Sequence, residues 1–144
     1  MNELIIIRGV PGSGKSTMAK TNYPDYMLAE ADMFRYDKDG NYIFTPESNA
    51  MAHRKCKEMV LKALNEGKNV VVANTFIKLS DMEPYVLFGF PFKIIEATGN
   101  FENRHNVPKE AIEKMHKNFM PVTEEWLKKI EEKTKILKNF NLDR

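Results

Sequence analysis

The sequence predicts an α/β fold in which a parallel sheet of about four strands is flanked by helices. Four apolar runs, at residues 3–8, 26–30, 69–74 and 92–98, alternate with segments of helical periodicity. The first and third runs are almost wholly apolar, as expected of strands that are covered on both faces of a parallel sheet. A glycine-rich segment directly follows the first run, where a phosphate-binding turn would stand.

Start and stop signals place the helices between these strands. Residues 45–47, Thr-Pro-Glu, supply an N-cap, a proline for the first helical position and an early carboxylate, and they open a long helix that Gly67 ends. Shorter helices are expected over residues 80–89 and after Pro108, followed by an amphipathic C-terminal helix over about 121–138. The apolar residues of that last helix are expected to pack inward: Trp126, Leu127, Ile130 and Leu137.

The composition indicates one globular domain over residues 1–144. The chain is 42% apolar and 29% charged, and no apolar run approaches the roughly 20 residues that span a bilayer. The net charge of +2 permits an anionic substrate without predicting strong attraction to nucleic acid. Because the single cysteine, Cys56, cannot form an internal disulfide and the N-terminus lacks signal-peptide features, we expect a cytoplasmic protein with no membrane partner.

The glycine-rich segment GVPGSGKST fits the phosphate-binding pattern G-x-x-x-x-G-K-[ST]. Its glycines let several backbone N–H groups converge on one anion, and the following helix points its positive end to the same place. Lys15 is expected to bind the β- and γ-phosphates, and the Ser16 hydroxyl to ligate Mg²⁺. The residues expected to bind ATP are Gly9, Pro11, Gly12, Ser13, Gly14, Lys15, Ser16 and Thr17.

The segment DKDG, residues 37–40, resembles metal-binding or phosphatase loops but lacks their context. The glycine has the wrong position for an EF-hand loop, and no buried apolar strand precedes the first aspartate. Because the segment lies between the alternating stretches MFRY and NYIF, it predicts a short hairpin turn.

Phosphoryl transfer requires a base near the acceptor hydroxyl and cations around the transferred group. No guanine-reading N-K-x-D segment is present, and the third strand ends in Asn74 and Thr75 without a motor-type acid. Asp32 is expected to end the second strand, at the sheet edge where ligands bind in open α/β folds, and Arg35 follows one turn later. The sequence therefore favours a kinase in which Asp32 is the candidate base and Arg35 flanks the acceptor.

The segments GVPGSGKST, EADMFR and ANTF, with RHNVP followed by IEKM, together resemble the phage polynucleotide 5′-kinase domain and its small P-loop relatives. The resemblance extends from residue 3 to about residue 120. It implies a P-loop kinase fold with four parallel strands and a lid at about residues 100–120.

The resemblance also implies roles for individual residues. Asp32 matches the base that takes the proton from the 5′-hydroxyl, Arg35 matches a contact to the acceptor phosphate, and Thr75 matches a threonine of the substrate pocket. Arg104 is the candidate lid arginine that engages the ATP phosphates. The chain departs from the family at Asn74, where the family has an aspartate, so an acceptor contact by a carboxylate becomes one by an amide.

The leading functional prediction is an ATP- and Mg²⁺-dependent kinase that transfers the γ-phosphate to the 5′-hydroxyl end of DNA or RNA, with Lys15, Asp32 and Arg104 as its catalytic residues. One alternative is a kinase for a small molecule, such as a nucleoside, sugar or antibiotic. Another is an ATP-binding module with little turnover. The aromatic and methionine side chains at residues 33–44 suit a closed pocket, stacking on a terminal base, or simple packing in the hairpin.

Overall fold

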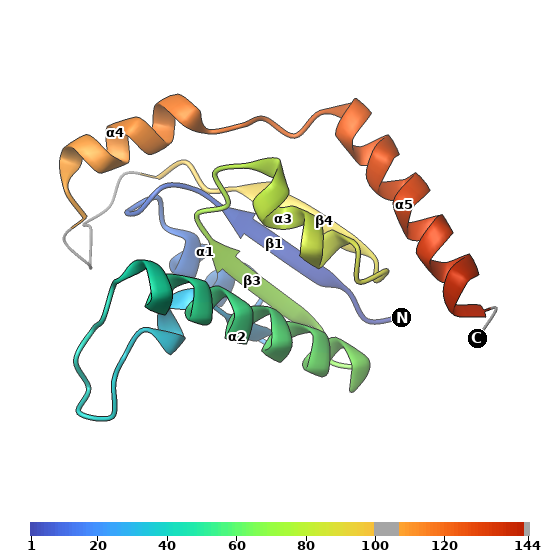
Figure 1. Ribbon diagram of the computed structural model, residues 1–144, viewed down its shortest axis with the longest axis horizontal. Helices are drawn as coiled ribbons and strands as arrows, with labels where there is room; N and C mark the ends of the chain where they lie inside the picture. The colour runs from blue at the N-terminus through green and yellow to red at the C-terminus, as the bar shows by residue number, and fades with distance from the viewer. Residues whose placement is uncertain (100–106, 143–144) are drawn as a thin grey trace.

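The structure is a computed structural model that describes residues 1–99 and 107–142. Its centre is a parallel sheet of four strands in the order β2-β3-β1-β4, and this confirms the predicted α/β fold. The strands are β1 (Leu4–Arg8), β2 (Met27–Ala29), β3 (Val70–Asn74) and β4 (Phe92–Glu96). Arg8 pairs in register with Asn74 on one side and with Glu96 on the other. The carboxyl ends of these three strands therefore meet at one edge of the sheet, and the arrowheads of β1 and β3 point to the same side in Figure 1.

Helices cover both faces of this sheet, as Figure 1 shows. Ala19 of α1 packs against alternate side chains of β1 and β3 on one face. Residues of α2, α3 and α5 pack on the other face, around Leu4 and Ile6. The helical segments are α1 (Lys15–Asn22), the 3₁₀ helix η1 (Ala31–Phe34), α2 (Pro46–Asn65), α3 (Leu79–Val86), α4 (Lys109–Asn118) and α5 (Glu124–Leu142). None of the helices in the described residues is long and apolar enough to cross a membrane.

The predicted boundaries of α2 and of the hairpin turn are confirmed. Thr45 caps α2, since its side chain accepts a hydrogen bond from the Ser48 backbone N–H. In the turn, Asp37 Oδ1 accepts backbone hydrogen bonds from Asp39 and Asn41, each at 2.9 Å. The turn therefore needs no metal or catalytic role to explain its acidic residues.

The inward face of α5 is narrower than the sequence predicts. Ile130 is buried and Trp126 packs partly against the core, as expected. Leu127 and Leu137 are instead 37% and 43% exposed. A helix docked on the outside of a small sheet buries only one stripe, and the i, i+4 pair of Trp126 and Ile130 occupies that stripe.

Arg8, the last residue of β1, is a buried cation that the sequence did not single out. Its side chain is only 1% exposed. Its Nη2 donates to the carbonyls of Phe76 and Ile77 at 2.7 and 3.2 Å, and its guanidinium lies 3.9 Å from the centre of the Phe119 ring. Arg8 thus joins the end of β1 to the segments that follow β3 and α4.

Candidate functional site

The phosphate-binding loop connects β1 to α1, and its shape depends on its glycines. Gly12 and Gly14 have φ angles of 82° and 89°, a left-handed conformation that glycine adopts without strain. At Gly9, an added Cβ would stand 2.4 Å from Ser13 Oγ and 2.7 Å from the Ala97 carbonyl oxygen. The loop therefore folds against the segment after β4 so closely that only glycine fits there.

Two side chains of the loop, those of Lys15 and Ser13, can donate hydrogen bonds to a phosphate group. Lys15 Nζ donates to the Val10 carbonyl at 3.0 Å, so the ammonium lies folded over the loop. Burial lowers the pKa of Lys15 to about 8, although the negative charges of Asp32 and then Glu30 act in the opposite direction. The Ser13 hydroxyl is buried and has no hydrogen-bond partner among the described residues. Both groups suit a bound anion.

Glu30 is a site residue that the sequence reasoning missed. It directly follows β2, and its Oε2 accepts a hydrogen bond of 2.9 Å from Ser16 Oγ, the hydroxyl expected to ligate Mg²⁺. The signal was present in the sequence, because the segment Glu-Ala-Asp places two carboxylates two residues apart after a strand. The sequence prediction gives a role to Asp32 and none to Glu30.

Asp32 lies within η1 and not at the end of β2, which stops at Ala29. Its Oδ1 accepts hydrogen bonds from Arg35 Nε at 2.7 Å and from the Tyr42 hydroxyl at 3.1 Å. Burial, together with the Asp32 charge and hydrogen bond, raises the pKa of Tyr42 to about 12, so this hydroxyl keeps its proton and donates it. The Asp32 side chain remains 40% exposed, so solvent and ligands have access to it.

Arg35 is 6% exposed, and its guanidinium lies near an aromatic ring, a histidine and the carboxylate of Asp32. The Phe44 ring lies 4.8 Å from its guanidinium carbon, and Nη2 lies 3.5 Å from Nε2 of His53. Burial and the Arg35 charge lower the pKa of His53, which favours the neutral ring beside this cation. Arg35 Nη1 is buried without a hydrogen-bond partner in the described part of the chain. The guanidinium therefore has one donor group left for a ligand.

Asn74 and Thr75 follow β3 at the same edge. Asn74 is 7% exposed, and its Oδ1 accepts a hydrogen bond of 2.8 Å from the Ala31 backbone N–H. Its Nδ2 lies 3.8 Å from the sulfur of buried Cys56. The Thr75 carbonyl accepts from Gly9 N at 3.2 Å. Contacts of these two residues with an acceptor stay predictions, since the hydrogen bonds named here join parts of the protein to one another.

The remaining predicted catalytic residue, Arg104, lies outside the described residues. A hollow of about 400 Å³ adjoins the phosphate-binding loop; its lining includes Gly9, Ser13 and Thr98 and, beyond β4, His116 and Phe119. This hollow opens beside the loop in which a phosphate would bind.

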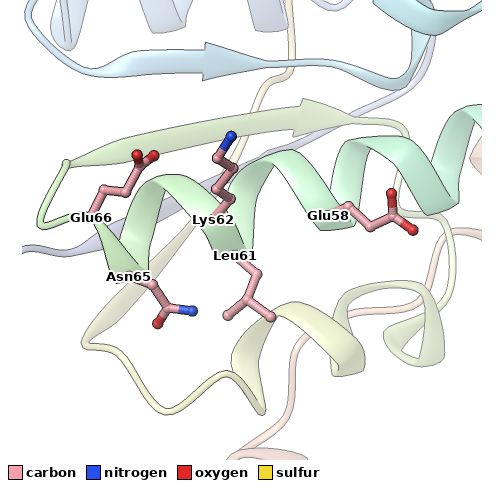
Figure 2. A pocket seen from close by; sticks show the side chains of 5 residues that line it. All are labelled: Glu58, Leu61, Lys62, Asn65 and Glu66. Atoms are coloured by element: carbon pink, nitrogen blue, oxygen red, sulfur yellow. The ribbon is translucent and has the colours of Figure 1, made fainter.

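A second hollow lies on α2 and includes none of the predicted site residues. Its lining is Glu58, Leu61, Lys62, Asn65 and Glu66. Figure 2 shows that these side chains, which come from α2 and from Glu66 directly after it, point in several directions rather than toward one centre. A group without convergent polar atoms does not form a binding site.

Comparisons with known proteins bear on the family and the fold of this chain. The family described as "AAA domain" matches residues 4–99. NEDD4-binding protein 2 of Homo sapiens is 30% identical over 138 aligned residues, which cover 81% of this chain but only 8% of that protein.

Solved structures share the fold at low sequence identity. One chain of the Pnkp1/Rnl/Hen1 RNA repair complex has a TM-score of 0.66 and 23% identity, over 82% of this chain and 44% of its own length. A sugar kinase from Janibacter sp. HTCC2649 has a TM-score of 0.53 and 20% identity, over 85% of this chain and 72% of its own. This chain thus spans less than half of the RNA repair protein and a small part of the human relative.

Proposed function

Because the chain belongs to the AAA domain family, we propose that it is an ATP- and Mg²⁺-dependent phosphotransferase whose acceptor is a 5′-hydroxyl at the end of DNA or RNA. One observation carries this proposal: the candidate base lies close enough to the lysine of the loop for its charge to act on the ammonium. Asp32 is the strongest of the charges that act on the buried Lys15 ammonium. A base must lie within reach of an acceptor hydroxyl while the phosphate lies on the loop, and this pairing supports both requirements.

In the proposed reaction, Asp32 accepts the proton of the acceptor hydroxyl as its oxygen attacks the γ-phosphorus in line. The bond between that phosphorus and the β–γ bridging oxygen breaks, and ADP leaves. Lys15 and the backbone N–H groups of the loop stabilise the charge that develops on the phosphate oxygens. Arg104 is proposed to add a second cation from the lid.

Ser16 offers an oxygen ligand of the type that Mg²⁺ prefers, at the first turn of α1 and beside a carboxylate. Bound with the nucleotide, Mg²⁺ would neutralise charge on the phosphates.

Two features of the acceptor side favour a nucleic acid end. Among the described residues, the buried Nη1 of Arg35, one turn from Asp32, has no hydrogen-bond partner, which suits a phosphate or carbonyl oxygen of the acceptor. The side chains of Met33, Tyr36 and Phe44 are 48%, 52% and 66% exposed. The exposed rings of Tyr36 and Phe44 suit stacking on a terminal nucleobase. The structural similarity to a chain of the Pnkp1/Rnl/Hen1 RNA repair complex supports the same choice.

The test is transfer of labelled γ-phosphate from ATP to 5′-hydroxyl DNA and RNA oligonucleotides. The same oligonucleotides carrying a 5′-phosphate, together with free nucleosides and sugars, serve as alternative acceptors. We expect label on the 5′-hydroxyl ends only, and we expect Asp32→Asn to abolish it while ATP affinity stays nearly unchanged. Asp39→Asn, an exposed carboxylate in the nearby turn, is the matched control and should transfer normally.

Label on a sugar or nucleoside but not on oligonucleotides would replace this proposal with a small-molecule kinase. ATP binding without transfer to any acceptor would indicate a binding module. Full activity of Asp32→Asn would refute the assignment of the base.

A further inference from the structure

The carboxylate of Glu30 has one hydrogen-bond partner in the described structure, and that partner is the hydroxyl of the phosphate-binding loop. Ser16 Oγ donates to Glu30 Oε2 at 2.9 Å, and both side chains are half-buried. The hydroxyl lies in the first turn of α1, and the carboxylate follows the last residue of β2. Two oxygen groups from different elements thus meet where Mg²⁺ bound to ATP would lie.

In P-loop enzymes generally, Mg²⁺ is held by the loop serine or threonine and by an acid at a strand end. One of the two neighbours of β1 is β3, and it ends in Asn74 rather than in an acid. The amide of Asn74 is directed to the Ala31 N–H and to Cys56, inside the protein. Two other strands bring a carboxylate to this edge, since β4 ends in Glu96 and Glu30 directly follows β2. Of these two, Glu30 is the one that accepts the hydrogen bond from Ser16 Oγ.

Structural roles do not account for the Glu30 side chain. Glu30 is the N-cap residue of η1, yet its side chain makes no capping hydrogen bond. No ion pair of Glu30 is found in the described parts of the chain, and its charge acts on Lys15 at the phosphate site. Burying a carboxylate costs free energy, so packing alone does not explain why the Glu30 side chain is half-buried beside a single hydroxyl.

We propose that Glu30 is the second protein group of the Mg²⁺ site: with Ser16 Oγ and the nucleotide phosphates it holds the metal, by direct ligation or through a bound water. Among the described residues, no group of three or more His, Cys, Asp or Glu side chains gathers into a cage. One carboxylate and one hydroxyl suit Mg²⁺, which keeps several waters and takes its other ligands from substrate phosphates.

The two carboxylates of the Glu-Ala-Asp segment then have separate tasks. Glu30 acts on the metal and Asp32 acts on the acceptor hydroxyl. This inference rests on the nucleotide half of the proposed function and not on the identity of the acceptor, so it is tested without any acceptor present.

The experiment measures Mn²⁺ binding by electron paramagnetic resonance in the presence of ATP, and ATP affinity in Mg²⁺ against EDTA. We expect Glu30→Gln to weaken Mn²⁺ binding to the complex at least about tenfold, in the range for groups that support a metal site. Affinity for metal-free ATP should be unchanged or higher, since a negative charge near the phosphates is removed. Asp32→Asn, the matched carboxylate two residues away, should leave Mn²⁺ binding unchanged.

If circular dichroism shows that Glu30→Gln is unfolded, Glu30→Asp is the variant to measure. It keeps the negative charge but shortens the side chain. It should show weaker Mn²⁺ binding with unchanged affinity for metal-free ATP. A folded Glu30 variant that binds Mn²⁺ and MgATP like the unchanged protein would overturn the proposal. Equal losses of Mn²⁺ affinity in Glu30→Gln and Asp32→Asn would also overturn it, because removal of any negative charge near the phosphates would then explain the effect. Failure of oligonucleotide phosphorylation leaves this result untouched.

Discussion

Affinity for ATP should depend on pH through Lys15. Burial lowers the pKa of this ammonium to about 8, even though Asp32 and Glu30 favour its charged form. With that pKa, Lys15 in the free protein is about nine-tenths protonated at pH 7 and about one-tenth protonated at pH 9. A bound triphosphate favours the charged form and raises the pKa of Lys15, so binding at pH 9 must first take up a proton. We therefore expect the apparent affinity to fall about tenfold between pH 7 and pH 9.

Equilibrium titration with a fluorescent ATP analogue, at constant Mg²⁺ and ionic strength, measures this effect. Lys15→Arg is the matched control, since a guanidinium stays charged over the whole range and its binding curve should not follow the same pH dependence. An affinity of the unchanged protein that stays constant within about twofold from pH 7 to pH 9 would refute the reasoning, because Lys15 would then have the pKa of an ordinary exposed lysine.

Two further substitutions test how the site is supported. Arg8→Met should lower the free energy of unfolding by about 3 kcal/mol in urea titrations, because it leaves the buried carbonyls that Arg8 binds without partners; a loss below about 1 kcal/mol would mean that water replaces the guanidinium. Asn74→Ala should cost about 1–3 kcal/mol by the same measurement, because the Ala31 N–H loses its partner. It should also reduce phosphoryl transfer more than ATP affinity, and an equal reduction of both would contradict a positioning role for Asn74.

The sheet and the phosphate-binding loop are predictable from the sequence because their signals are local. Near-continuous apolar runs identify strands that are buried on both faces, and the glycine spacing identifies the loop between β1 and α1. The cap at Thr45 and the turn at residues 37–40 are likewise encoded within a few residues. These elements agree with the structure to within one or two residues at each end.

The interior of the site is less predictable because its contacts join distant parts of the chain. Arg8 reaches a carbonyl 68 residues away, and Asn74 accepts from a backbone group 43 residues away. Nothing in the sequence singles out Arg8, and only the structure shows that its side chain is buried and hydrogen-bonded to carbonyls. The sequence leaves the role of Tyr42 open between a closed pocket, stacking on a base and packing in the hairpin. Its hydrogen bond to Asp32 depends on how the hairpin folds back.

The asparagine that ends β3 and the glutamate that follows β2 are two parts of one arrangement. A buried aspartate in place of Asn74 would accept the hydrogen bond from Ala31, but it would place a third negative charge near Glu30 and Asp32. The neutral amide avoids that cost and still holds the backbone between the two carboxylates. Glu30 precedes Ala31 and Asp32 follows it, and both charges act on the Lys15 ammonium. The absence of an acid at the end of β3 is therefore compatible with metal-dependent chemistry, since the adjacent strand supplies the carboxylate and Asn74 fixes its position.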